Sequence, residues 1–222
     1  MFSFTDNGLI LGLSRHGENG FILSVFTENH GRYMGLLRTK NPPLVGSLGY
    51  FHWQARLEEH LGTFKVEMKE SLSFPYLDDK KRLACLSSLY FLLNATLPER
   101  ENYADFYRDV LSFIQNLSRN DFLSAYVKME LKLLSVLGFG LDFSKCAGGG
   151  NPEHLAYVSP KTGKAVSFEK GEPFRQKLLI LPSFLWKDVP ATPTDIQNGL
   201  ILTGFFLSRH LTKLPVLRGT LL

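Results

Sequence analysis

The sequence predicts an α+β protein in which a small β-barrel precedes a helical region. Short runs of β-branched, aliphatic and aromatic residues, separated by Gly and Asn turns, fill residues 8–69. Beyond them, apolar residues recur at the helical period. Pro75 and Asp78 lie between the two patterns, where a strand can end and a helix can begin. We therefore expect a barrel domain over residues 1–77 and an α-helical domain over residues 78–222.

Five strands are expected in the barrel. They are Gly8–Leu13, Phe21–Phe26, Arg32–Arg38, Tyr50–Leu57 and Thr63–Met68. Turns at residues 16–20, 29–31 and 59–62, and a Pro/Gly-broken loop at residues 39–49, separate them. A five-stranded barrel of this size is the OB-fold, which commonly binds oligonucleotides.

The helical region shows three amphipathic segments and a further helix start. The apolar positions are Leu83, Leu86, Tyr90, Leu93 and Leu97 in the first, Phe106, Val110, Phe113 and Leu117 in the second, and Leu123, Val127, Leu131, Leu134 and Leu137 in the third. Thr192 followed by Pro193 is typical of a capped helix amino terminus. Before it, residues 157–166 indicate a small hairpin and residues 172–181 a short helix.

The charge is unevenly distributed along the 222 residues, whose formal net charge is +4. Lys and Arg number 8 against 9 Asp and Glu in residues 1–80, 8 against 7 in residues 81–150, and 9 against 5 in residues 151–222. The barrel is thus slightly acidic, and the excess positive charge lies in the last third.

The hydrophobic segments, the amino terminus and the cysteine number indicate where in the cell the protein is found. No apolar run reaches the roughly 20 residues that a membrane helix needs. The amino terminus lacks the basic start and apolar stretch of a secretion signal, and two cysteines are too few for a disulfide framework. We expect a cytoplasmic protein of bacterial type that does not bind membranes.

Basic and aromatic residues are interleaved in the last three expected barrel strands. The candidate DNA contacts are Arg32, Arg38, Lys40, Arg56, Lys65 and Trp53, with Tyr33, Tyr50 and Phe51 among them. Single-stranded DNA binding needs such a mixture, because cations follow the phosphates and flat rings stack on the bases. The alternative is structural: strand alternation turns half of the rings into the core, and scattered surface cations are ordinary.

The sequence gives little basis for catalysis. The six histidines form no H-x-x-x-H pair, and no G-x-x-x-x-G-K-[ST] run is present. Two rivals to DNA binding stay open. One is a non-catalytic adaptor whose barrel contacts only protein, and the other is a small hydrolase that uses Cys146 or Ser14 with a histidine. We expect a protein that is not an enzyme and needs no cofactor.

Several segments, taken in order, resemble one bacterial family. They are FTENHGRYMGLLR at residues 26–38, WQARLEEHLGTFKVE at 53–67, CAGGGNPEHLAYVSPKTGKAVS at 146–167 and LSRHLTKLPVLRGTLL at 207–222. Together they resemble the RecO recombination mediators over most of the chain. The resemblance implies an amino-terminal OB barrel and an α-helical carboxyl-terminal domain.

The resemblance also implies a function in which no bond is made or broken. A RecO-like protein is expected to bind single- and double-stranded DNA and to anneal complementary strands. It acts with RecR in DNA repair and homologous recombination, and helps to load recombinase onto strands coated by single-stranded DNA-binding protein. This implies the bacterial cytoplasm, at the nucleoid during repair. Family members often have several basic residues after the third strand, where this chain has Arg38-Thr39-Lys40-Asn41-Pro42.

Some RecO-like proteins carry a four-cysteine zinc site in the region that corresponds to residues 142–170. A tetrahedral structural site needs about four Cys or His ligands. Here Cys146 is the sole cysteine, and His154 is its nearest candidate partner. We therefore expect a degenerate zinc-finger-like hairpin without the zinc ligands, and Cys146 as an ordinary loop residue.

Basic residues gather near the carboxyl terminus. Arg209, Lys213 and Arg218 could simply be cations placed favourably near a helix carboxyl end. The resemblance adds a functional reading, because RecO-like proteins bind the acidic, aromatic-tipped tail of single-stranded DNA-binding protein through their helical domain. These three residues are the candidate contacts for that partner.

Overall fold

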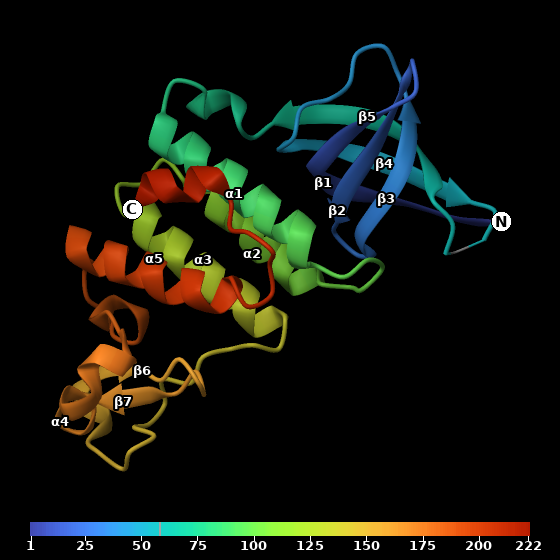
Figure 1. Ribbon diagram of the computed structural model, residues 1–222. Coiled ribbons are helices and arrows are strands. Elements are labelled where there is room, and N and C mark those ends of the chain that lie inside the picture. Colours follow the sequence, from blue (N-terminus) through green and yellow to red (C-terminus); the bar gives the residue numbers. More distant parts are fainter. Residues whose placement is uncertain (58) are drawn as a thin grey trace. The chain divides into compact units, whose positions relative to one another are not determined.

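The computed structural model describes residues 1–57 and 59–222. Packing divides the chain into two compact units, residues 1–117 and residues 118–222 (Figure 1). The expected barrel domain lies within the first unit, whose described residues also include two α-helices. The first unit therefore combines the barrel with the helices that follow it in sequence.

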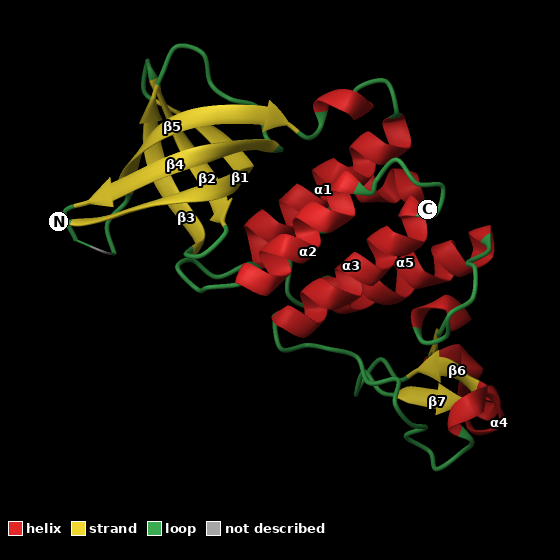
Figure 2. Ribbon diagram, turned by 180° about the vertical axis from the view of Figure 1, so that it is seen from behind, coloured by secondary structure: helices red, strands yellow, loops and turns green. Residues whose placement is uncertain are grey.

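A closed five-stranded barrel occupies the start of the chain (Figure 2). Its strands are β1 (Phe2–His16), β2 (Gly20–Thr27), β3 (Gly31–Arg38), β4 (Ser47–Ala55) and β5 (Gly62–Ser71). The order around the barrel is β1-β2-β3-β5-β4. β3 and β5 run parallel, whereas the other neighbours in this order are antiparallel. The α+β fold class with an amino-terminal OB barrel is thereby confirmed.

β1 is much longer than the six residues expected for the first strand. Its first half pairs with β4, from Phe2 opposite Ala55 onward, and its second half pairs with β2, as far as His16 opposite Gly20. The register shifts between Ile10 and Gly12, which is where a bulge lets the strand bend from one neighbour to the other. Closure of the barrel therefore requires a long, curved strand that apolar alternation alone does not reveal.

The barrel interior is filled by apolar side chains from all five strands. The buried set is Ile10, Leu23, Val25, Tyr33, Phe51, Trp53, Ala55 and Phe64. Trp53 is 1% exposed, and its indole Nε1 donates a hydrogen bond to the Met34 carbonyl oxygen at 3.0 Å. A buried indole with a satisfied N–H contributes a large apolar area without leaving a polar group unpaired.

Two helices complete the first unit, α1 (Lys80–Thr96) and α2 (Ala104–Gln115). Asp79 caps α1, because its side chain accepts the backbone N–H of Arg82 at 3.0 Å. The helix start expected at Asp78 is therefore wrong by one residue.

Aromatic rings join the second helix to the barrel within this unit. The Phe26 ring of β2 lies 6.4 Å from the Phe106 ring and 5.2 Å from the Tyr107 ring, both on α2. The connection between the helices also reaches β3, since the backbone N–H of Arg100 donates to the Arg32 carbonyl at 2.9 Å.

The second unit combines two long helices with a small sheet. The helices are α3 (Phe122–Val136) and α5 (Pro193–Leu207), and the short helix α4 covers Phe168–Gly171. The sheet has the order β7-β6-β8, with β6 at Leu155–Val158, β7 at Ala165–Ser167 and β8 at Leu179–Ile180. The predicted hairpin is therefore confirmed as β6 and β7. Among the described residues, no helix is long and apolar enough to span a membrane.

Of the helix boundaries predicted in this unit, the start of α5 is correct and the helix expected before it is shorter than predicted. Thr192 forms a capping box with Asp195, as the sequence around Pro193 predicts. The short helix expected over residues 172–181 is only partly correct. A 3₁₀ helix covers Glu172–Lys177, after which the chain extends into β8 and pairs with the open edge of β6.

A buried ion pair ties the carboxyl-terminal segment to the helices of the second unit. The Arg218 guanidinium donates to both carboxylate oxygens of Glu130 on α3, at 2.7 Å and 2.9 Å. It also donates to the Thr203 hydroxyl at 3.0 Å and to the Leu200 carbonyl, both on α5. Arg218 is 4% exposed and Glu130 is fully buried, so the prediction of Arg218 as an exposed partner contact is wrong.

Replacing Arg218 with Ala should lower the free energy of unfolding by roughly 3–5 kcal/mol, because it removes the cation that compensates the buried Glu130 carboxylate, to which the Thr203 hydroxyl still donates. Urea unfolding followed by circular dichroism measures the loss. The matched control is Arg175→Ala, which removes an exposed ion pair with Glu172 and should have a much smaller effect. Equal losses in the two variants would contradict the structural role of Arg218.

Candidate nucleic-acid interface

One end of the barrel brings together residues from three strands. Arg15 of β1 pairs with Phe21 of β2, and Gly20 pairs with Arg38 at the end of β3. The Thr39 backbone N–H donates to the carbonyl oxygen of Asn19 in the β1–β2 turn at 3.1 Å. The turn and the start of the loop after β3 are thereby held side by side.

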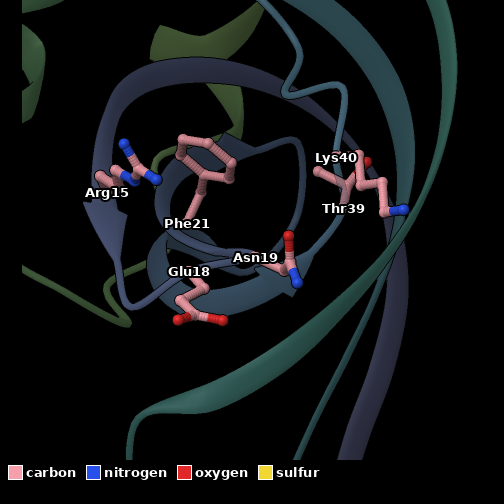
Figure 3. A pocket seen from close by; sticks show the side chains of 6 residues that line it. All are labelled: Arg15, Glu18, Asn19, Phe21, Thr39 and Lys40. Atoms are coloured by element: carbon pink, nitrogen blue, oxygen red, sulfur yellow. The ribbon is translucent and has the colours of Figure 1, made fainter.

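A pocket of about 340 Å³ opens at this end of the barrel (Figure 3). Its lining consists of Arg15, Glu18, Asn19, Phe21, Thr39 and Lys40. In the view of Figure 3, Arg15 lies on one side of the Phe21 ring and Lys40 on the other. We call this group, together with Arg38, the barrel-end site.

The charged groups of the barrel-end site face solvent. Arg15, Glu18, Arg38 and Lys40 are exposed, and none has an ion-pair partner within the described part of the chain. Three cations against one carboxylate give this end a local positive balance, although residues 1–80 as a whole are slightly acidic. A local field of this kind attracts phosphates independently of the net charge of the domain.

The structure divides the other predicted DNA contacts among separate places. Lys65 is exposed on β5 opposite His52, on the outer face of the barrel. Arg56 follows Ala55, which pairs with Phe2 at the opposite end of β1 from the barrel-end site. Arg38 and Lys40 are therefore the two predicted contacts that lie together.

Two of the predicted DNA contacts make interactions inside the protein. Trp53 is a core residue, so its prediction as a base-stacking ring is wrong. Arg32 has a side chain only 13% exposed, and its Nε donates to the Leu97 carbonyl at 2.8 Å. Its guanidinium thus holds the segment after α1, and a DNA contact by Arg32 stays a prediction.

Sequence reasoning missed Arg15 and Phe21. Both lie on the hairpin of β1 and β2, directly opposite each other. Counting back across the expected turn at residues 16–20 would have paired them, because positions equidistant from a hairpin turn face each other.

A second exposed surface lies at the carboxyl end of α5. We define the C-terminal patch as Ile201, Phe205, Arg209 and Lys213, which are all exposed. The Arg209 guanidinium lies 5.4 Å from the centre of the Phe205 ring and also donates to the Pro160 carbonyl at 3.0 Å. The patch therefore combines an apolar stripe with cations, whereas Arg218 belongs to the interior.

Cys146 lies in the loop that precedes the hairpin. Its Sγ accepts the backbone N–H of Ser167 at 3.2 Å. Burial raises the pKa of the Cys146 thiol, but hydrogen bonds from Ser167 and from the backbone N–H groups of Gly150 and Gly148 outweigh it and leave the pKa below its ordinary value. His154 is bonded instead to Glu169, with Nδ1 and Oε1 2.8 Å apart.

The donor set around Cys146 can be compared with that of a metal site. Over residues 1–57 and 59–222, no group of three or more Cys, His, Asp or Glu side chains gathers in a way that could hold a metal ion. That the protein carries no zinc stays a prediction.

A closed OB barrel followed by helices and a small carboxyl-terminal sheet places this chain among OB-fold proteins with an appended helical region. The family described as "Recombination protein O N terminal" matches residues 1–72, and "Recombination protein O C terminal" matches residues 77–218. The chain belongs to the RecO family of DNA repair and recombination proteins.

Curated relatives agree with this assignment along nearly the whole chain. The DNA repair protein RecO of Rhodospirillum rubrum is 39% identical over 224 residues, covering 95% of this chain and 89% of the relative. That of Bartonella quintana is 42% identical over 215 residues, covering 92% and 88%. That of Rickettsia canadensis is 38% identical over 212 residues, covering 93% and 88%.

Cys146 should ionise at a lower pH than an ordinary cysteine, because its thiolate accepts backbone hydrogen bonds. The thiolate absorbance near the far-ultraviolet edge, recorded against pH in a Cys85→Ser variant, measures this directly. The same titration in urea provides the unfolded reference. A folded transition at or above the unfolded one would contradict the hydrogen-bonded thiolate.

Proposed function

We propose that this protein is a recombination mediator that binds single- and double-stranded DNA and anneals complementary strands. It acts with RecR to load recombinase onto single strands coated by single-stranded DNA-binding protein, in the bacterial cytoplasm and at the nucleoid. The observation that carries the proposal is the barrel-end site, where Arg15, Arg38 and Lys40 are exposed around the Phe21 ring. Cations for phosphates beside a ring for bases are what single-stranded DNA binding uses.

The mediator works by binding and displacement, without catalysis. The Cys146 sulfur accepts a hydrogen bond from the Ser167 backbone N–H, and His154 is engaged with Glu169, which argues against a hydrolase that uses Cys146 with His154. A hydrolase that uses Ser14 with a histidine is tested by assaying for hydrolysis directly. The adaptor alternative, a barrel that contacts only protein, is favoured by the acidic balance of residues 1–80. The two are separated by whether oligonucleotide binding exists and falls with salt.

Changing Arg15, Arg38 and Lys40 together to Ala should weaken oligonucleotide binding and flatten its dependence on salt. Each phosphate contact on single strands contributes about 0.7 to the slope of log K against log salt, so three cations give up to about 2 units. Fluorescence anisotropy of a labelled oligonucleotide over a salt series measures both quantities.

The matched control changes Arg56, Lys65 and Lys69 to Ala, which removes the same charge from other parts of the barrel. A larger effect of the control would place the DNA along β5 and the end of the barrel where β4 finishes. An unchanged slope in both triple variants would place the phosphates off the barrel, and an absence of DNA binding by the unaltered protein would favour the adaptor.

The C-terminal patch suits the tail of single-stranded DNA-binding protein. Ile201 and Phe205 are 53% and 37% exposed on successive turns of α5, with Arg209 above the Phe205 ring. An acidic peptide with an apolar end is complementary to an exposed apolar stripe that has a basic rim. We include this tail among the proposed partners on that chemistry.

Changing Arg209 and Lys213 to Ala should weaken binding of the tail peptide by roughly 3- to 30-fold, since each of two solvent-exposed ion pairs contributes up to about 1 kcal/mol. Isothermal calorimetry with the full-length protein measures the affinity. Salt should weaken but not abolish binding, because the apolar end is not screened. The double variant Arg175→Ala/Lys177→Ala is the control, and an equal loss there would assign the effect to overall charge instead of the patch.

A further inference from the structure

The pocket of the barrel-end site has the dimensions of a site for one small, flat group. Its volume of about 340 Å³ is close to the lower limit of roughly 300 Å³ for small-molecule pockets. The Phe21 ring provides an apolar wall, and the Asn19 and Thr39 backbones are joined by a hydrogen bond, which fixes the turn against the loop. One unstacked nucleobase fits this description, whereas a duplex or a folded peptide does not.

The charges around the pocket indicate a ligand that carries both phosphates and hydrogen-bond donors. Arg15 and Lys40 lie to either side of Phe21 in Figure 3, where they can contact the phosphates that flank a stacked base. Glu18 does not suit a site for phosphate alone, because its carboxylate repels phosphate. It suits a ligand that also presents hydrogen-bond donors, since an ionised carboxylate only accepts.

The four bases differ in what they offer to a carboxylate. Guanine presents N1–H and N2–H side by side, which matches the two oxygens of Glu18 and gives a paired, charge-assisted contact. Cytosine and adenine present one amino group next to a ring nitrogen acceptor. Thymine presents a single N–H between two carbonyl oxygens, which face the carboxylate unfavourably.

We propose that the barrel-end pocket receives one unstacked base of a bound single strand, and that Glu18 makes it prefer guanine and disfavour thymine. The proposal rests on the proposed function, because the strand must first be bound. Glu18 is then a specificity-determining residue in a site whose Arg15 and Lys40 contacts do not depend on sequence. The preference for guanine applies to one nucleotide of the bound strand, and the other nucleotides bind without base selectivity.

Guanine and inosine provide the sharpest test, because inosine lacks only the N2 amino group. The full-length protein is titrated with labelled oligonucleotides of TTG repeats and of TTI repeats, where I is inosine, and affinity is read by anisotropy. We expect the TTG strand to bind more than about tenfold more tightly, because the N2 amino group adds one hydrogen bond to a charged acceptor. In Glu18→Gln, which keeps the size but loses the charge, the preference for guanine should fall at least severalfold, because a neutral amide oxygen accepts a weaker hydrogen bond than a carboxylate.

The control is Glu67→Gln, which removes an exposed carboxylate from β5 and should keep the preference for guanine. Equal binding of both strands by the unaltered protein, together with a normal salt dependence, overturns the base-reading pocket but leaves DNA binding intact. A preference that is undiminished in Glu18→Gln also overturns it, because the group that selects guanine then lies elsewhere. Failure to bind either strand instead contradicts the proposed function itself.

Discussion

Closure of the barrel between β3 and β5 is the constraint on which the first unit depends. The two strands meet at Gly35 opposite Gly62, the parallel contact that completes the circle. A Cβ on Gly62 would lie 2.2 Å from the Trp53 ring, and one on Gly35 would lie 2.7 Å from the Phe64 ring. Because glycine has no side chain, Gly35 and Gly62 leave room where β3 meets β5 for the Phe64 and Trp53 rings to fill the interior. Because those rings occupy the core, the exposed chemistry of the barrel is confined to its ends and outer face.

The second unit depends on a different kind of constraint. Glu130 and Arg218 are 88 residues apart in sequence, yet their charges meet where both are shielded from water. Such a pair adds little net stability relative to apolar residues of similar size. It disfavours other arrangements of the segment, because any arrangement that separates the two residues leaves a buried charge without a partner charge. It fixes the carboxyl-terminal segment against α3 and α5, so that Arg209 and Lys213 are left as the exposed cations of the C-terminal patch.

The parts of the structure that sequence reasoning predicts are those encoded by neighbouring residues. Turn glycines separate the five strands, and the Thr192 capping box marks the start of α5. What it does not predict depends on partners distant in the chain. The length of β1 follows from its pairing with both β2 and β4, and β8 forms because β6 has an open edge. Neither relation has a local signature.

The same distinction explains the outcome for the site residues. Trp53 and Arg218 are residue types common at interfaces, and only three-dimensional packing shows that both are interior here. Arg15 and Phe21 are candidates because they lie opposite each other on β1 and β2. The position of the hairpin turn fixes this register, so the pairing could have been predicted from the sequence.

The acidic balance of the barrel segment does not contradict a basic site, because the acids are not equivalent. The Asp6 carboxylate is 4% exposed and accepts hydrogen bonds from the Asn7 and Asn29 backbones at 2.9 Å and 2.7 Å, so its charge serves the fold. Asp79 caps α1 and pairs with Arg82. Charges compensated in this way contribute little to the field at the opposite end of a strand, since solvent and local partners screen them. What a phosphate meets at the barrel end is the local set of three cations and Glu18. A single free carboxylate in such a set opposes phosphate binding, and its presence in the pocket lining is accounted for when the ligand also brings hydrogen-bond donors.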